Sequence, residues 1–175
     1  MKKLFLILAM GMALLPACNR QAAPAGDALP FNPYVEAFTT GKISRQAPVY
    51  VMLNQPVDSA VMASVNWKKA AKITPQAAGT FAFENNHTII FKPSEAFERN
   101  TNYTVTLDIS QWFEAAEGSD KQFSFRFSTL PLMMRGYVQS LDPVEGSENA
   151  YDVSAVIYTS DTETPETVQS LIRFP

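Results

Sequence analysis

Apolar and polar residues alternate one by one along several short segments of this 175-residue chain. The alternation is clearest in residues 49–53, 81–83, 103–109 and 123–128, and a shorter apolar run occupies residues 88–91. Because successive side chains of a β-strand point to opposite faces, each such strand has one apolar and one polar face. This pattern predicts an all-β protein in which two antiparallel sheets bury their apolar faces against each other.

The turn and helix signals fit such a β-sandwich. Residues 84–87 are turn formers between two apolar runs and predict a hairpin. Helical signals are few: we expect one short helix within residues 59–67 and another within 93–99, with Ser94 as its N-cap. The segment 34–131 has about the length, roughly 100 residues, of an immunoglobulin-like β-sandwich.

Four segments resemble bacterial Ig-like domains. Residues 48–58 resemble the early strand and its turn, residues 88–93 the middle strand, residues 97–105 the corner before the penultimate strand, and residues 125–129 the closing strand. In such a corner a tyrosine at the strand start returns its hydroxyl to the backbone of the preceding loop, and Tyr103 is the candidate. The alternative role for Tyr103 is an aromatic that packs across strands.

The N-terminus has the pattern of an export signal. Two lysines precede an uncharged stretch, residues 4–15, which is shorter than the roughly 20 apolar residues of a membrane-spanning helix. The next residues, Leu15-Pro16-Ala17-Cys18, resemble the lipobox of bacterial lipoproteins. That resemblance implies cleavage before Cys18 and acylation of its thiol and new amino group, because several acyl chains are needed for stable anchoring. The alternative is a plain secreted protein.

These features divide the first 33 residues into a signal peptide, residues 1–17, and a tether, residues 18–33, rich in Ala, Pro and Gly. Asn19 comes directly after the cysteine, whereas an Asp there resembles the inner-membrane retention signal of Gram-negative lipoproteins. We therefore expect a chain that is lipid-anchored in the bacterial cell envelope, at the outer membrane.

A second unit is expected in residues 132–175. It contains a strand within 133–141, a polar turn, and a strand within 151–158. Ser160-Asp161 resembles a helix cap before an apolar stripe of Val168, Leu171 and Ile172. The unit is too short for a second sandwich, so we interpret it as the start of a second β-rich domain of a longer protein.

Lipobox, tether, Ig-like domain and the junction at residues 159–168 resemble, in this order, bacterial alpha-2-macroglobulins. The resemblance implies a protease trap built from macroglobulin-type β-domains, in which a thioester captures the attacking protease. A thioester needs a cysteine in a Cys-Gly-Glu-Gln type motif, but the only cysteine is Cys18, with Asn19-Arg20-Gln21 after it. This chain therefore lacks the thioester.

Composition excludes several function classes. Lys and Arg total 14 and Asp and Glu 17, a formal net charge of −3, so there is no basic excess for nucleic acid. One cysteine permits neither an internal disulfide nor a cysteine-rich zinc site. One histidine leaves little scope for metal or triad chemistry. We expect no metal and no cofactor.

Two sets of polar residues could carry chemistry. His87, at the expected hairpin tip, could be a catalytic base, although a solvated turn residue is the favoured interpretation. Glu114, Glu117 and Asp120 could bind calcium or perform acid–base chemistry, but their spacing favours a solvated loop.

Two further features concern carbohydrate. Trp67 and Trp112 could form a platform for a glycan, although aromatics at strand ends more often close a core. Asp58-Ser59-Ala60 resembles the three-residue O-glycosylation site of exported Bacteroidetes proteins.

Together these features predict a membrane-anchored, non-enzymatic module at the N-terminal part of an alpha-2-macroglobulin-like endopeptidase inhibitor. Its expected partners are the membrane, the remaining domains of a longer chain, and proteases. The alternative is a surface lipoprotein whose Ig-like domain binds a glycan or a protein.

Overall fold

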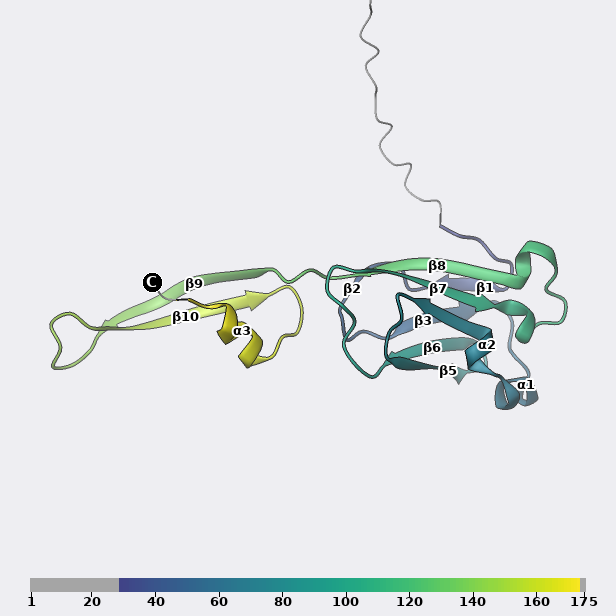
Figure 1. Ribbon diagram of the computed structural model, residues 1–175, viewed down its shortest axis with the longest axis horizontal. Helices are drawn as coiled ribbons and strands as arrows, with labels where there is room; N and C mark the ends of the chain where they lie inside the picture. Colours follow the sequence, from purple (N-terminus) through teal and green to yellow (C-terminus); the bar gives the residue numbers. More distant parts are fainter. Residues whose placement is uncertain (1–28, 174–175) are drawn as a thin grey trace, which may run out of the picture.

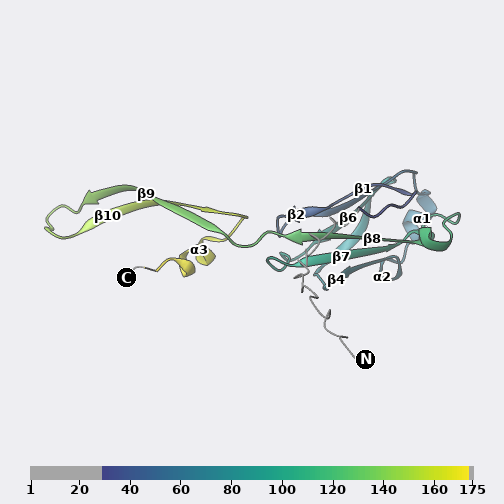
Figure 2. The same ribbon diagram turned by 90° about the horizontal axis from the view of Figure 1, so that it is seen from above.

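The computed structural model describes residues 29–173, so Cys18, the expected signal peptide and most of the expected tether lie outside the described residues. The described chain forms a β-sandwich and, after it, a separate hairpin that extends along the long axis of the molecule (Figures 1 and 2). No helix in this part of the chain is long and apolar enough to cross a membrane.

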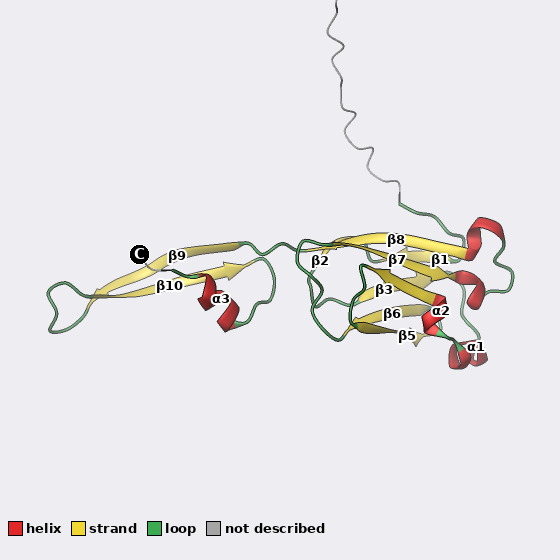
Figure 3. Ribbon diagram, in the orientation of Figure 1, coloured by secondary structure: helices red, strands yellow, loops and turns green. Residues whose placement is uncertain are grey.

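The sandwich consists of two four-stranded sheets (Figure 3). The first sheet is antiparallel throughout, in the order β1 (Val35–Phe38), β3 (Val49–Leu53), β6 (Thr88–Pro93) and β5 (Gly79–Asn85). The second has the order β2 (Gly41–Ile43), β8 (Gln122–Thr129), β7 (Asn102–Asp108) and β4 (Ala71–Thr74). Within this second sheet β2 runs parallel to β8, while the other neighbours are antiparallel.

The core lies between the two sheets and matches the alternation of the sequence. In β3, β7 and β8 every second residue is buried, and the residues between them are exposed or half-buried. The largest fully buried side chains are Tyr103, Phe91, Phe97, Phe125 and Leu53. The predicted all-β sandwich and the hairpin of β5 and β6 are therefore confirmed.

The short helices differ from the prediction. The single helix expected within residues 59–67 is replaced by two, α1 (Ser59–Ser64) and α2 (Trp67–Ala70), because the chain is extended at Val65 and Asn66. The Asp58 carboxylate accepts a hydrogen bond from the Ala60 N–H at 2.7 Å and so begins α1. Two 3₁₀ turns, η1 (Ile109–Gln111) and η2 (Gly118–Lys121), connect β7 to β8.

The helix expected within residues 93–99 is wrong, and Ser94 caps no helix. Three backbone N–H groups of this segment donate to partners outside it and not to the carbonyls of a helical turn. The N–H of Ser94 donates to the Ala78 carbonyl, that of Phe97 to the Arg45 carbonyl, and that of Glu98 to the Tyr103 hydroxyl. Tertiary contacts therefore replace the expected helix.

After the sandwich, β9 (Met134–Pro143) and β10 (Tyr151–Thr159) form an antiparallel hairpin, and α3 (Pro165–Leu171) comes next. Both strands were predicted, but the helix cap was not. Thr164 is the N-cap of α3, its hydroxyl accepts a hydrogen bond from the Thr167 N–H at 3.3 Å, and Pro165 opens the helix. The expected cap residue Asp161 instead binds the sandwich.

Candidate functional site

The loop before β7 is fixed by a tyrosine corner. The Tyr103 hydroxyl accepts a hydrogen bond from the Glu98 N–H at 3.0 Å, while the buried ring stacks on Phe127 with the centroids 5.3 Å apart. Both roles considered for Tyr103, the corner and the packing aromatic, are therefore present. A buried hydroxyl with a backbone partner specifies the path of this loop.

Two more side chains hold the same loop. The fully buried Thr129 hydroxyl donates to the Glu98 carbonyl at 2.6 Å and accepts from the Thr101 N–H at 3.0 Å. The Arg45 Nε donates to the Phe97 carbonyl at 2.6 Å. Side-chain hydrogen bonds therefore hold this loop at Phe97, Glu98 and Thr101, on both sides of Arg99.

Asp161, between β10 and α3, binds the loop after β2. Its carboxylate accepts from the Ser44 hydroxyl at 2.6 Å and from the Arg45 N–H at 2.7 Å. The N–H of Thr162 donates to the same carboxylate at 2.8 Å. One carboxylate thus joins two segments that lie more than 100 residues apart in the sequence.

Glu163 makes the second connection. Its carboxylate accepts hydrogen bonds from both Nε and an η nitrogen of Arg99, the two-point geometry that favours arginine over lysine. The Glu163 side chain is 4% exposed. We call Ser44, Arg45, Arg99, Asp161 and Glu163 the junction clasp, because these residues hold the sandwich and the hairpin in one orientation.

The protein environment favours the charged form of Asp161. Partial burial alone would raise the pKa of Asp161, but hydrogen bonds from the Ser44 hydroxyl and from the Arg45 and Thr162 N–H groups, together with the charge of Arg45, lower it below its ordinary value. Asp161 is therefore charged at neutral pH.

The root of the hairpin is closed by Ser160. Its hydroxyl donates to the Pro131 carbonyl and accepts from the Met133 N–H at 2.9 Å, and its own N–H donates to the Met133 carbonyl. The connection from β8 to β9 therefore has little freedom beside the clasp.

His87 is a turn residue in the structure. Its N–H donates to the Asn85 side-chain oxygen at 2.8 Å, and its Nδ1 lies 3.1 Å from the Leu53 carbonyl. Neither neighbour is a nucleophile or a carboxylate, so these contacts give His87 no catalytic partner.

The acidic loop residues are not assembled into a site. Glu114 and Glu117 are exposed, while the Asp120 carbonyl accepts a hydrogen bond from the buried Asn32 side chain at 3.0 Å. Within residues 29–173 no group of three acidic, histidine or cysteine side chains is placed to hold a metal ion.

The two tryptophans close one end of the core. Trp112 is 5% exposed, and its ring lies 6.0 Å from that of half-buried Trp67, measured between ring centroids. Phe81 and Phe83 pack against Trp67. An aromatic glycan platform needs exposed ring faces, so this pair does not form one. Ser59, in the O-glycosylation-like motif, is exposed at the start of α1.

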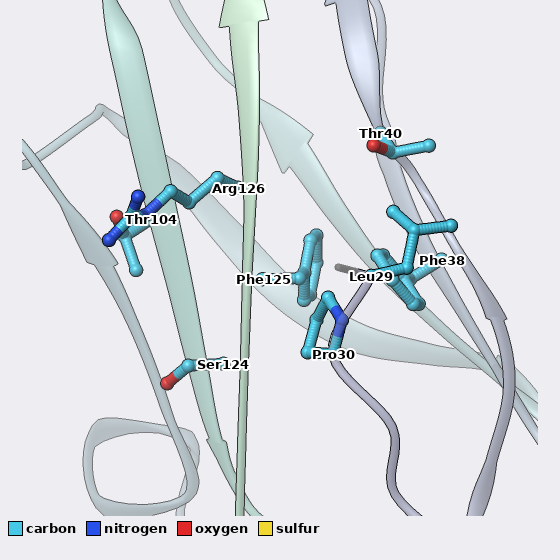
Figure 4. A pocket seen from close by; sticks show the side chains of 8 residues that line it. All are labelled: Leu29, Pro30, Phe38, Thr40, Thr104, Ser124, Phe125 and Arg126. Carbon is cyan, nitrogen blue, oxygen red and sulfur yellow. The ribbon is translucent and has the colours of Figure 1, made fainter. Parts of the chain in front are cut away.

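A shallow cavity of about 480 Å³ lies along β8. It is lined by Leu29, Pro30, Phe38, Thr40, Thr104, Ser124, Phe125 and Arg126 (Figure 4). The figure shows Ser124 and Arg126 on one side of β8 and the apolar Leu29, Pro30 and Phe125 on the other. The polar groups of this lining do not converge on one point, as a catalytic or specific binding site requires.

Sequence reasoning missed the junction clasp. Its five residues come from three separate segments, and polar loop residues of this kind are common in any sequence. The only available signal was the pair of acidic residues, Asp161 and Glu163, directly after a predicted strand.

Two packed sheets, an aromatic core and a tyrosine corner define an immunoglobulin-like β-sandwich. A comparison with models of protein families matches residues 33–129 to the bacterial Ig-like domain. This match covers more than half of the chain, which therefore belongs to the family of bacterial Ig-like domains. No curated protein sequence matches the chain.

A comparison with solved structures finds a likeness to L,D-transpeptidase 3 from Mycobacterium tuberculosis, at 15% identity and a TM-score of 0.41 over 58% of this chain and 39% of that chain. An L,D-transpeptidase from Mycobacterium smegmatis gives 15% identity and a TM-score of 0.39 over 58% and 41%. The similarity thus spans about two fifths of each enzyme and has no bearing on the activity of this chain.

Proposed function

We propose that this chain is a membrane-anchored, non-enzymatic module in the N-terminal part of an alpha-2-macroglobulin-like endopeptidase inhibitor. In this role the Ig-like domain is a spacer between a lipid at Cys18, in the outer membrane, and further domains. The proposal depends on the lipobox resemblance and on the order of parts along the chain, lipobox, tether, Ig-like domain and β-rich unit.

The observation that carries the spacer role is the junction clasp. A flexible linker would suffice to connect two independent domains, yet Asp161 and Glu163 bind the sandwich by side-chain hydrogen bonds and an ion pair. Glu163 is almost fully buried, so loss of Arg99 would leave a buried charge without a partner. A module built this way transmits a fixed orientation to the next domain of the polypeptide.

The inhibitor role is tested on the complete gene product. A protease trap encloses its target, so a trapped protease should still cleave a small chromogenic peptide but no longer a large protein substrate. Residues 29–175 alone should inhibit neither reaction. Undiminished cleavage of the large substrate by several proteases in the presence of the complete product would contradict the inhibitor role.

The alternative function, binding of a glycan or a protein by the Ig-like domain, no longer has its aromatic platform because Trp112 is buried and Trp67 half-buried. An exposed apolar surface does exist, but it lies on the terminal hairpin and not on the Ig-like domain.

A further inference from the structure

The terminal hairpin has one apolar and one polar face in its distal half. Three directly opposed pairs form the apolar hairpin face: Val138 with Ala155, Leu141 with Val153, and Pro143 with Tyr151. The opposite face carries Ser140 with Ser154 and Asp142 with Asp152. Two aspartates directly opposite each other repel, and they are tolerated best in water. The polar face is therefore the solvent side.

A β-bulge keeps the apolar hairpin face continuous. Ser154 pairs with Ser140, but the next residue, Ala155, pairs with Val138, so Gln139 is the extra residue of β9. Without this extra residue Val138 would point to the polar face, because one step in register turns a side chain to the other side of the sheet. The bulge places Val138 beside Leu141 on the apolar face.

All six side chains of this face are exposed, from 53% for Val153 to 62% for Val138 among the large ones. Figures 1 and 2 both place α3 beside the half of the hairpin that is nearer to the sandwich, so the helix leaves the distal half bare. Within residues 29–173, β9 and β10 pair only with each other. A two-stranded hairpin of this kind is marginally stable in water and gains stability when its apolar face is covered.

We propose that the apolar hairpin face is one inner layer of a second β-sandwich, covered by a sheet of strands that come after α3 in the complete polypeptide. This proposal rests on the proposed function, in which the chain carries further domains. It adds that the hairpin is a structural part of the next domain and names the face that this domain buries.

The size of the face argues against a second copy as the occupant. The distal half of the hairpin is roughly 17 Å long and two strands, or roughly 10 Å, wide. Two copies packed face to face would share only a few hundred Å², whereas stable specific interfaces bury roughly 1,200 Å² or more. Strands of the same polypeptide can cover more area, because they can also pair with the open edges of β9 and β10 and so widen the hairpin into a larger sheet. The junction clasp holds the hairpin in place for a partner in the same polypeptide.

The test introduces single thiols in a Cys18→Ala background, so that residues 1–175 contain no other cysteine, and mass spectrometry of tryptic peptides measures labelling at each introduced position separately. Val153→Cys places a thiol on the apolar face, and Ser154→Cys, its neighbour, places one on the polar face. In residues 29–175 both thiols should react with a maleimide at similar rates at all protein concentrations. In the complete polypeptide the thiol at position 153 should react at least tenfold more slowly, while that at position 154 should not change.

Equal reactivity at both positions in a folded complete polypeptide would overturn the proposal. So would a gene product that ends at Pro175, or protection of position 153 in residues 29–175 that grows with concentration, since this result would identify a second copy. Circular dichroism of each variant checks folding, and Leu141→Cys replaces Val153→Cys if that variant does not fold. Protection at position 153 without any inhibition of proteases would support this inference and refute the inhibitor role.

Discussion

The hydroxyl of Tyr103 and the backbone N–H of Glu98 form a hydrogen bond of 3.0 Å one residue before Arg99, which binds the terminal unit. The corner of the sandwich and Arg99 of the junction clasp are therefore parts of one loop. Tyr103, in the interior of the Ig-like domain, thus fixes the loop from which Arg99 binds Glu163 of the terminal unit.

Tyr103→Phe should destabilise the protein by about 1–3 kcal/mol, because it leaves the Glu98 N–H without its partner while the ring stays packed. Tyr103→Ala should cost more, about 3–5 kcal/mol, since it also removes a buried ring. Urea denaturation of residues 29–175 measures both. Tyr137→Phe, on the exposed hairpin, is the control and should change stability by less than about 0.5 kcal/mol. Equal effects at positions 103 and 137 would show that the corner hydrogen bond is not stabilising.

Phe125→Ala should cost about 3–5 kcal/mol and make the sandwich sensitive to protease, because Phe125 is fully buried between the sheets. Phe31→Ala is the matched control: the same side chain is removed, but Phe31 is 88% exposed, so the expected change is within about 0.5 kcal/mol. The measurement is the thermal midpoint together with limited proteolysis. If Phe125→Ala behaved like the wild type, the assignment of Phe125 to the buried face of β8 would be wrong.

The orientation of the hairpin should depend on pH through Asp161. Because folding lowers the pKa of Asp161, its contribution is present above the unfolded value of about 3.9 and is lost as pH falls through the lower folded pKa. Distances between spin labels on the sandwich and the hairpin should be narrowly distributed at pH 7 and broaden only in this acidic range.

The variant Asp161→Asn distinguishes the contribution of Asp161 from the protonation of other carboxylates at acidic pH. The asparagine carries no charge and has one accepting oxygen, whereas Asp161 uses two oxygens for the N–H groups of Arg45 and Thr162, so the distance distribution should be broad already at pH 7. A distribution as narrow as that of the wild type would show that Asp161 does not hold the hairpin.

Cys18→Ala should move the protein from the membrane fraction to the soluble fraction and leave the thermal midpoint of the sandwich unchanged. The signal would still direct export, but no acyl chain could be attached. Fractionation of cells and a thermal melt of the released protein test both parts. A variant that remains in the membrane fraction would refute the lipid anchor, and a large drop in the midpoint would make Cys18 structural.

The sequence predicted the strands in which burial and alternation coincide, such as β7 and β8. It missed β1 and β4, with four residues each, and β2, with three, because such short segments carry too little alternation to be recognised. It also predicted a helix where the N–H groups of Ser94 and Phe97 donate to the carbonyls of Ala78 and Arg45. No local pattern contains the information that these distant carbonyls lie beside the segment.

The site was harder to predict than the fold for a related reason. Tyr103 was found because the corner has a local pattern of its own, whereas Asp161 resembled a helix cap and proved to bind Ser44, 117 residues away. A polar residue in a loop has many possible partners, and only the three-dimensional arrangement selects among them.

The parallel pairing of β2 with β8 has a mechanical consequence. Gly41, Lys42 and Ile43 lie beside Phe127, Ser128 and Thr129, and the chain enters β2 from the N-terminal side and leaves β8 toward the hairpin. A force that pulls these two ends apart acts along both strands in opposite directions. This force loads the hydrogen bonds between β2 and β8 in shear. The bonds then share the load at the same time and do not break one after another. Although β2 is short, its pairing with β8 is therefore a place where a stretched chain meets hydrogen bonds that are loaded in shear.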